Sequence, residues 1–425
     1  MDHSSHSVCI VDNGLFTAMA PMLARSFGKV YYTTPTAGPF PKSNDYLVGK
    51  GLPGVTRLTD PDEALGMYEK IDLFVFPDLY HPGKQKMLRA LGKRVWGSGD
   101  AEMLELDRLA MKRHAAKIKL DIGEYVVLKG MTAVEEFVKS HPGWWLKSSR
   151  HAKPTGRGNF ETCECKSYSE IRFRLDDIRV GLGPEAETTE FIMEKPIPDA
   201  IELATDVYTV WGEFPDKGVL GLEAKSKSYL AKVVNYDDYP PGLIEVNEAM
   251  SDVFRQTKYA NMAAIECRIT KDGTAYVLDP CLRRGRPPLC LDELITNWAD
   301  IIWAGGAGEL VQPKFSGVWA AEMLLYCDYA EEHFTPITCP DEYLSNLKLS
   351  NYYRKGGEIF VVPQVYRLSG IGSVVAVGAT AEAAIKKCRE AASHISGHKV
   401  TIEDELDACL KQIDGAKAFG VKAFG

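Results

Sequence analysis

Residues 263–286 read AAIECRITKDGTAYVLDPCLRRGR, and they form the most informative segment of the chain. Residues 263–270 alternate apolar and polar side chains, and residues 275–278 are apolar. Between them, Lys271-Asp272-Gly273 has the residue types of a tight turn. Two such runs joined by a short turn containing glycine predict a β-hairpin.

The predicted hairpin would hold two carboxylates side by side. Because successive strand residues point to opposite faces, Glu266 should project from the polar face of the first strand, with Asp279 at the end of the second. Two close carboxylates repel unless a cation lies between them, and Mg²⁺ is bound by carboxylates together with phosphate oxygens. Three arginines follow, Arg283, Arg284 and Arg286. A surface hairpin with solvated charges would show the same residues, so this segment alone leaves both interpretations open.

The bulk composition indicates a globular protein of several units. A chain of 425 residues exceeds a single core and predicts two to four domains or subdomains. The net charge of −8 argues against a stable nucleic-acid partner, which usually requires a basic surface. No apolar run has the length of a membrane span, and the first residues lack the pattern of a signal peptide. The ten cysteines are dispersed without zinc-site spacing, which favours a cytoplasmic location.

The first hundred residues alternate between strand and helix patterns. The predicted elements are strands at 7–11, 29–33, 72–77 and 94–97 and helices at 16–27 and 84–91. Such alternation is typical of a parallel α/β sheet. The turn Asp12-Asn13-Gly14 lacks the G-x-G-x-x-G frame of a dinucleotide-binding loop, so NAD is not predicted.

The remaining chain adds polar loops and strands with charged ends. The predicted elements are helices at 101–118, 289–304 and 381–395 and strands at 144–150, 190–197, 202–211, 318–326, 359–362 and 374–378. The loop 153–160, after a strand that carries Lys147, combines glycines, hydroxyls and cations and suits close approach to phosphate oxygens. Lys225, Lys227 and Lys232 form a second cationic group. The duplicated tail at 417–425 is interpreted as a flexible end.

The order of these segments resembles the ATP-grasp superfamily, and is most similar to glycinamide ribonucleotide synthetases (phosphoribosylamine–glycine ligases) and, near residues 193–197, to biotin carboxylases. The family pattern Glu…acid-x-Asn-x-Arg is matched by Glu266 and then by Asp279-Pro280-Cys281-Leu282-Arg283. Two departures are visible. Asp279 replaces the usual Glu, and Cys281 replaces the usual Asn, which puts a soft thiol where Mg²⁺ favours oxygen.

The resemblance implies a mixed α/β and α+β architecture, the ATP-grasp fold. Its parts would be an N-terminal Rossmann-like pre-ATP-grasp domain at residues 1–106, an ATP-grasp domain at 107–312 and a small C-terminal α+β domain at 313–425 with a flexible tail. The ATP-grasp domain would consist of subdomains at about 107–192 and 193–312.

The resemblance also implies roles for individual residues. The nucleotide would be bound by Arg108 and Lys147 at its phosphates, by Glu194, Lys195 and Ile197 of the hinge at adenine, and by Glu202 at ribose. The metal ligands would be Glu266, Asp279 and, with the doubt that its thiol raises, Cys281. Arg283 would stabilise the transferred phosphoryl group as the catalytic residue, while Arg284 and Arg286 would bind the substrate carboxylate.

The implied function is an ATP-dependent carboxylate–amine ligase that forms an amide bond through an acyl phosphate and releases ADP and phosphate. ATP and Mg²⁺, with Mn²⁺ as the alternative ion, would be the cofactors, and small carboxylates and amines the partners. A homodimer is compatible with this resemblance. Two alternatives stay open: an ATP-binding regulatory protein with reduced catalysis, favoured by Cys281, and an ATP-grasp kinase that stops at phosphoryl transfer.

Overall fold

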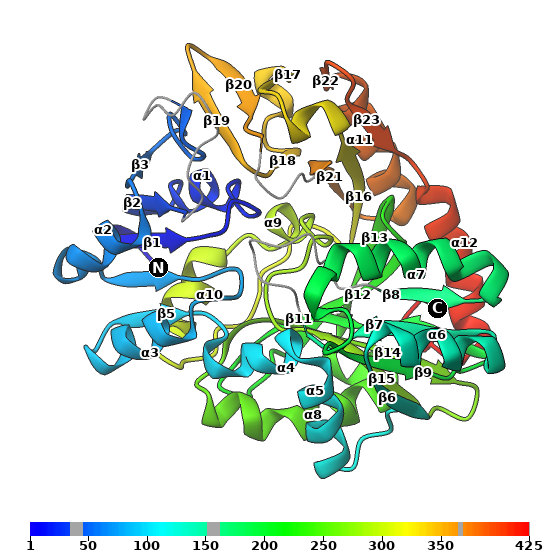
Figure 1. Cartoon of the computed structure of the whole chain (residues 1–425). Coiled ribbons are helices and arrows are strands. Elements are labelled where there is room, and N and C mark those ends of the chain that lie inside the picture. Colours follow the sequence, from blue (N-terminus) through cyan, green and yellow to red (C-terminus); the bar gives the residue numbers. More distant parts are fainter. Residues whose placement is uncertain (35–45, 151–161, 364–368, 425) are drawn as a thin grey trace.

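The computed structural model describes residues 1–34, 46–150, 162–363 and 369–424 (Figure 1). The loop 153–160, predicted to approach phosphates, therefore lies outside the described residues. Within the described part of the chain, no helix combines the length and the apolar character that crossing a bilayer requires.

The N-terminal part is a five-stranded parallel sheet in the order β3-β2-β1-β4-β5, which confirms the predicted α/β pattern. Its strands are β1 (His3–Val11), β2 (Phe27–Thr33), β3 (Val55–Arg57), β4 (Leu73–Val75) and β5 (Arg94–Trp96). The associated helices are α1 (Met19–Leu23), α2 (Pro61–Gly66) and α3 (Pro82–Ala90). The central strands are apolar and almost fully buried, as parallel strands covered on both faces must be.

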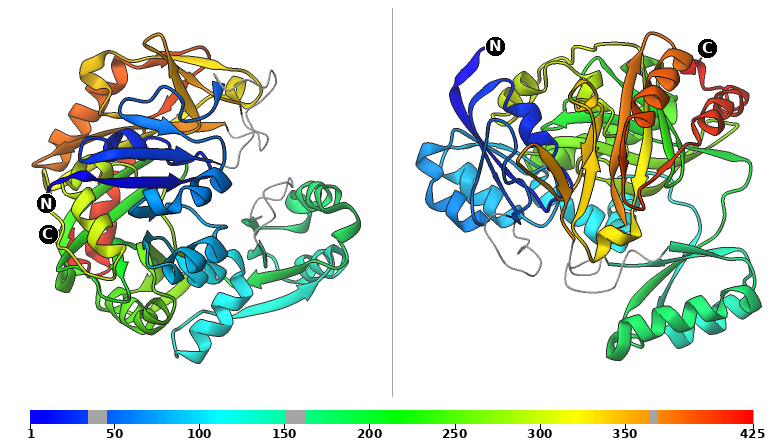
Figure 2. Two further views of the ribbon diagram at one scale, coloured as in Figure 1. Left: turned by 90° about the vertical axis from the view of Figure 1, so that its left-hand side faces the viewer. Right: turned by 90° about the horizontal axis from the view of Figure 1, so that it is seen from above.

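A small antiparallel unit projects from the body of the molecule (Figure 2). Its strands are β6 (Tyr125–Lys129), β7 (Trp144–Ser148), β8 (Thr162–Cys165) and β9 (Glu190–Glu194), in the order β6-β9-β7-β8. Helices α6 (Met131–Ser140) and α7 (Tyr168–Leu182) pack on it around a separate hydrophobic cluster that includes Leu146 and Met193. The unit thus has its own core and presents the ends of β7 and β9 to the body.

A ten-stranded sheet forms the body. It contains β10 (Ala200–Leu203), β11 (Thr205–Val210), β12 (Lys217–Ala224), β13 (Ser228–Asn235), β14 (Ala260–Thr270), β15 (Ala275–Cys281), β16 (Trp319–Tyr326), β18 (Leu347–Leu349), β21 (Gly370–Gly378) and β23 (Thr401–Glu403). β13 pairs with β16, so the sheet continues across residue 313, where the sequence predicts a domain boundary.

The remaining elements cover or extend this sheet. β17 (Thr335–Thr338), β19 (Tyr352–Lys355), β20 (Glu358–Val361) and β22 (Ser396–Gly397) form a further four-stranded sheet, and the helices are α8 (Pro241–Gln256), α11 (Ala381–Ser393) and α12 (Leu406–Ala418). The tail predicted to be flexible is packed instead. Phe424 is 5% exposed and stacks on Trp319, because the apolar ring finds a partner on β16.

The predicted hairpin is confirmed as β14 and β15. The amide of Thr270 donates to the carbonyl of Thr274 at 3.1 Å, and the Asp272 carboxylate accepts from the Thr274 amide at 3.2 Å. Gly273 has φ +89°, which a side chain would disfavour. The turn residues therefore fix the register as far as Cys267, which pairs with Val277, and the register shift that follows brings Glu266 opposite Asp279.

Three of the predicted helices differ from the structure, two because they are divided and one because it is shorter. The helix predicted at 101–118 is divided into α4 (Met103–Leu106) and α5 (Arg108–Lys117), because Asp107 is extended and caps the amide of Ala110 at 2.9 Å. The helix predicted at 289–304 is divided into α9 (Leu291–Leu294) and α10 (Trp298–Gly305), because Ile295 forms a bridge to Phe315.

The third of these helices, predicted at 16–27, is observed only as α1, which begins at Met19 and ends at Leu23. Phe27, which suits the apolar stripe of that helix, instead begins β2 and is buried. The strand predicted at 202–211 is likewise two strands, β10 and β11, both of which pair along β14.

Candidate functional site

Glu266 and Asp279 lie directly opposite each other across β14 and β15. Ile265 and Cys267 are buried on the other face, as the alternation predicts. The Glu266 side chain is 37% exposed and that of Asp279 is 26% exposed, so both can still reach a bound ion. A register shift between Glu266 and Cys267 marks a bulge at this point, a common way to aim side chains at a site.

Asp279 is held by two cations from other elements. Lys147 at the end of β7 places Nζ 2.7 Å from Oδ2, and Arg108 at the start of α5 places Nε 2.9 Å from Oδ1. Burial by itself would raise the pKa of Asp279, but Lys147 and Arg108 outweigh it and lower the pKa to about 2. Asp279 is therefore ionised at neutral pH and available to a metal ion.

Lys147 also joins the hairpin to the end of β9. Its Nζ lies 2.9 Å from Oε2 of Glu194, the last residue of β9, and Lys112 of α5 lies 2.7 Å from Oε1 of the same carboxylate. Burial disfavours the charged lysine, yet Asp279 and Glu194 raise the pKa of Lys147 above its usual value. The sequence marks Lys112 only as part of a helix; its ion pair with Glu194 depends on a distant strand.

Glu266 lies in an acidic cluster around one lysine. Lys225, just after β12, places Nζ 3.3 Å from Glu266, 3.0 Å from Glu202 and 3.5 Å from Glu223. Burial raises the pKa of Glu266, and repulsion from Glu202, Asp279 and Glu223 acts in the same direction, against Lys225. Three carboxylates around a single ammonium leave surplus negative charge, which a divalent cation would neutralise.

The side chains fit a hydrated or phosphate-bound Mg²⁺ better than a site made of protein ligands alone. Among the residues that the structure describes, no group of three His, Cys, Asp or Glu side chains is arranged to hold an ion. Glu266 and Asp279 supply two carboxylates, which is the usual protein share where substrate phosphates complete the octahedron.

Cys281 lies on the same strand as Asp279, paired with Ala264. Its Sγ donates a weak hydrogen bond to the carbonyl of Arg283 at 3.8 Å, and burial raises the pKa of the thiol well above its usual value. A neutral thiol is a poor ligand for Mg²⁺, so the environment of Cys281 argues against a role as metal ligand.

Arg283 joins the hairpin to the N-terminal part of the chain. Its Nε lies 2.8 Å from Oε1 of Glu105 and its Nη1 lies 3.2 Å from Oδ1 of Asp78. Burial alone would lower the pKa of Arg283, but Glu105 and Asp78 raise it well above its usual value. These two acids come from segments far away in the sequence, and no local signal identifies them as partners of Arg283.

Arg284 and Arg286 differ in their availability. The Arg284 side chain is 5% exposed, forms an ion pair with Asp292 and lies over the Trp298 ring at 4.9 Å. Arg286 donates to the carbonyl oxygen of Gly370, and burial lowers its pKa. Glu322 only partly offsets this effect of burial, and Arg286 has no ion pair among the described residues, so it is the better candidate for a carboxylate substrate.

Of the residues expected to form a hinge, Glu194 ends β9, and Lys195 and Ile197 follow it. The Lys195 amide donates to the carbonyl of Glu124 at 3.0 Å, and its exposed Nζ lies 2.8 Å from the Glu124 carboxylate. Ile197 lies close to Gly123, which has φ +66°. The structure therefore brings the two chain crossings between body and projecting unit together, next to Glu194.

No protein-family model matches this chain. No curated protein matches it in sequence either.

Solved structures share its architecture along almost the whole chain. Phosphoribosylamine–glycine ligase from Thermotoga maritima superposes with a TM-score of 0.68 at 16% identity and covers 93% of this chain and 98% of its own. A second similar structure is the biotin carboxylase domain dimer of the Hydrogenobacter thermophilus 2-oxoglutarate carboxylase, solved with MgADP and bicarbonate. It superposes with a TM-score of 0.65 at 13% identity, and the match covers 98% of this chain and 95% of its own. N5-carboxyaminoimidazole ribonucleotide synthetase from Thermotoga maritima superposes with a TM-score of 0.59 at 16% identity, and the match covers 93% of this chain and 99% of its own. The chain therefore has the fold of these ligases, the ATP-grasp fold, as the motifs predict.

Proposed function

We propose that this chain, with its ATP-grasp fold, is an ATP-dependent carboxylate–amine ligase that works through an acyl phosphate. The observation that carries the proposal is the charge arrangement at the hairpin. Glu266 and Asp279 face each other, while the side-chain nitrogens of Lys147, Arg108 and Lys225 approach one or other carboxylate within 3.3 Å from β7, α5 and the turn after β12. Acids for a metal and cations for phosphates thus meet in one place, which is what transfer of a phosphoryl group requires.

In this proposal, the nucleotide phosphates lie between the projecting unit and the hairpin. Lys147 and Arg108 form ion pairs with Asp279 in this structure. When the nucleotide binds, both side chains would also donate hydrogen bonds to phosphate oxygens. Mg²⁺, held by Glu266 and Asp279, would neutralise the phosphates, and Mn²⁺ would be the expected substitute. Support comes from a structural neighbour solved with MgADP. Adenine would contact the backbone at Glu194 to Ile197.

The Glu202 carboxylate, which lies 3.0 Å from Nζ of Lys225, would accept hydrogen bonds from the ribose hydroxyls. This completes the nucleotide site in the proposal, because Glu202 and Glu266 share the same lysine. Replacing Lys225 would therefore disturb ribose and metal binding together.

The acceptor would be a small carboxylate bound by Arg286. One carboxylate oxygen attacks the γ-phosphorus, the bond to the β,γ-bridging oxygen breaks, and ADP leaves, while Arg283 stabilises the charge on the transferred group. An amine then attacks the acyl carbon, phosphate leaves with its bonding electrons, and the amine loses a proton. The products are an amide, ADP and phosphate.

The proposed setting is the cytoplasm, since all ten cysteines are free thiols. The assembly is proposed to be a homodimer, as a structural neighbour is described as a dimer. The division into units at 1–106, 107–312 and 313–425 stays a prediction.

The function is tested by ADP release. Calorimetric titration with ATP, with and without Mg²⁺, comes first; binding that needs Mg²⁺ is expected. Release of ADP is then screened over small carboxylates with and without amines. Turnover that requires both substrates supports a ligase, and turnover with the carboxylate alone supports a kinase. ATP binding without turnover over the whole screen would favour the regulatory alternative that the Cys281 thiol suggests.

The metal positions are tested by Glu266→Gln, which should abolish turnover because it removes one of the two carboxylates. Glu136→Gln is the matched control, since Glu136 is exposed on α6 of the projecting unit. Equal turnover in both variants would place the metal elsewhere.

A further inference from the structure

A cavity of about 380 Å³ lies between the N-terminal domain and the C-terminal strands. One wall is formed by α1 and the residues before β3, including Met22 and Pro53. The opposite wall is formed by β18, β19 and β20, including Leu349 and Ile359. Its volume falls in the range of ligand pockets, roughly 300 to 1,000 Å³. The described lining residues include none of those assigned to the ATP site.

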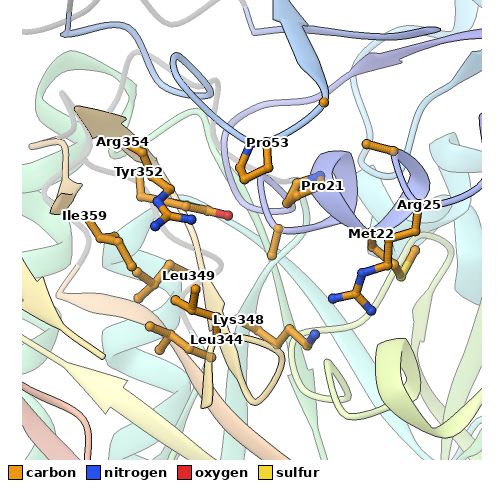
Figure 3. A pocket seen from close by; sticks show the side chains of 14 residues that line it. Pro21, Met22, Arg25, Pro53, Leu344, Lys348, Leu349, Tyr352, Arg354 and Ile359 are labelled. Atoms are coloured by element: carbon orange, nitrogen blue, oxygen red, sulfur yellow. The ribbon is translucent and has the colours of Figure 1, made fainter. Parts of the chain in front are cut away.

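The polar part of the lining is cationic. Arg25, Lys348 and Arg354 line the cavity, and no acidic side chain is among the described lining residues. Figure 3 shows Arg25 and Lys348 pointing toward one another, with Arg354 on the other side of the cavity. A mostly apolar space with three positive charges at its edge is suited to an anion that carries an apolar body.

The charge of two of these cations is incompletely neutralised. Lys348 is 5% exposed and its Nζ lies 2.6 Å from Oε1 of Glu293, while Nη1 of Arg25 lies 3.9 Å from the same oxygen. Burial lowers the pKa of Lys348, and repulsion from Arg25 adds to this effect. One carboxylate therefore serves two cations, and a second anion would lower the energy of both.

Arg354 retains hydrogen-bonding capacity. Its amide donates to the carbonyl of Lys50 at 2.9 Å, which fixes β19 against the N-terminal domain. Within the described residues, its guanidinium makes one hydrogen bond, from Nη2 to the carbonyl of Gly357 at 3.4 Å. That distance is long for a hydrogen bond, so the planar fork remains available to a carboxylate, sulfonate or phosphate.

We propose that this cavity is a second ligand site, separate from the ATP site, for a small anion with an apolar body. The anionic group lies between Arg354 and the Arg25–Lys348 pair, and the apolar body packs against Met22, Leu349 and Ile359. Such a ligand contacts both the N-terminal domain and the C-terminal strands, so it holds the two together and stabilises the folded chain.

The test uses anilinonaphthalene sulfonate, a fluorescent probe with an apolar body and one anionic group. The full-length protein should bind it with a saturable fluorescence increase at one site, and saturating Mg·ATP should leave that binding unchanged. Phenylnaphthylamine, which keeps the aromatic rings and lacks the sulfonate, should bind at least about tenfold more weakly, the ratio of one charge-assisted hydrogen bond. Equal binding of the two probes would overturn the proposal.

Variants locate the probe. Arg25→Gln and Arg354→Gln should each weaken sulfonate binding about tenfold, while Lys86→Gln, an exposed cation on α3, should leave it unchanged. Ala18→Phe should narrow the cavity and weaken both probes. Each variant is first shown to melt at the wild-type temperature.

Unchanged binding in Arg25→Gln, Arg354→Gln and Ala18→Phe together would place the probe elsewhere and refute the site. Loss of probe binding as protein concentration rises, with dimers in sedimentation, would show that a second copy covers this face and would also overturn the proposal. No step of the test requires turnover, so its failure is distinct from failure of the proposed ligase activity.

Discussion

Replacing Asp279 by Asn removes the carboxylate that Lys147 and Arg108 bind. The pKa of Asp279 lies at about 2, against an ordinary value of 3.8, which corresponds to about 2 kcal/mol in favour of the ionised, folded state. Lys147 keeps its 2.9 Å ion pair with Glu194, and Arg108 keeps the carbonyl of Ser148 at 3.2 Å, so neither cation is left without an acceptor. We therefore expect Asp279→Asn to lower the free energy of unfolding by about 2 kcal/mol at pH 7.

The pH dependence follows from the sign of the shift. A carboxylate whose pKa is lower in the folded state contributes its full stability above its unfolded pKa and loses it only as pH falls toward the folded value. The difference between wild type and Asp279→Asn, measured by urea unfolding, should thus be equal at pH 7 and pH 5. Asp177→Asn is the control, since Asp177 is exposed on α7. A difference near zero at pH 7, or one that already declines between pH 7 and pH 5, would refute the reasoning.

Three further outcomes are expected. Cys281→Asn should keep or raise the affinity for Mg·ATP in calorimetry, because it replaces a neutral thiol by an oxygen ligand; a large loss would assign the thiol another role. Arg283→Lys should lower kcat, whereas Arg286→Ala should chiefly raise the KM of the carboxylate, and equal KM increases in both would make them a common binding patch. Gly14→Ala should lower the melting temperature, since Gly14 has φ +95° and an added Cβ would lie 1.9 Å from Oδ1 of Asn351. An unchanged melting curve would contradict the inference that position 14 requires glycine.

The hairpin could be predicted because its signals are local. The turn 271–273 and the alternation around Glu266 lie within a few residues of one another, and together they predict the pairing from Ile269 with Ala275 to Cys267 with Val277. The bulge that brings Glu266 opposite Asp279 instead of Leu278 has no such local signal. The same reasoning fails for 101–118, where the apolar pattern continues through Asp107 although its side chain ends one helix and caps the next. The apolar periodicity of a sequence does not reveal an N-cap residue when the residues before and after it both favour a helix.

The partners of the site residues could not be predicted. Lys112 forms an ion pair with Glu194, and Arg283 forms ion pairs with Asp78 and Glu105. In each pair the two residues are far apart in the sequence, and only the folded structure brings them together. The sequence marked Lys225 as cationic, but only the pairing of β10 and β12 with their neighbours places it among three acids. Charge type can be read from a sequence, whereas charge pairing is a property of the fold.

The pairing of β13 with β16 has a consequence for how the molecule can be divided. Five residue pairs join the two strands, from Ser228 with Met323 to Lys232 with Trp319. A chain that ended at residue 312 would leave that side of β13 with its amides and carbonyls unpaired, beside apolar side chains such as Leu230 and Ala231. An unprotected apolar strand edge recruits other chains. The C-terminal residues therefore act as the cover that keeps the strands of residues 1–312 from aggregating.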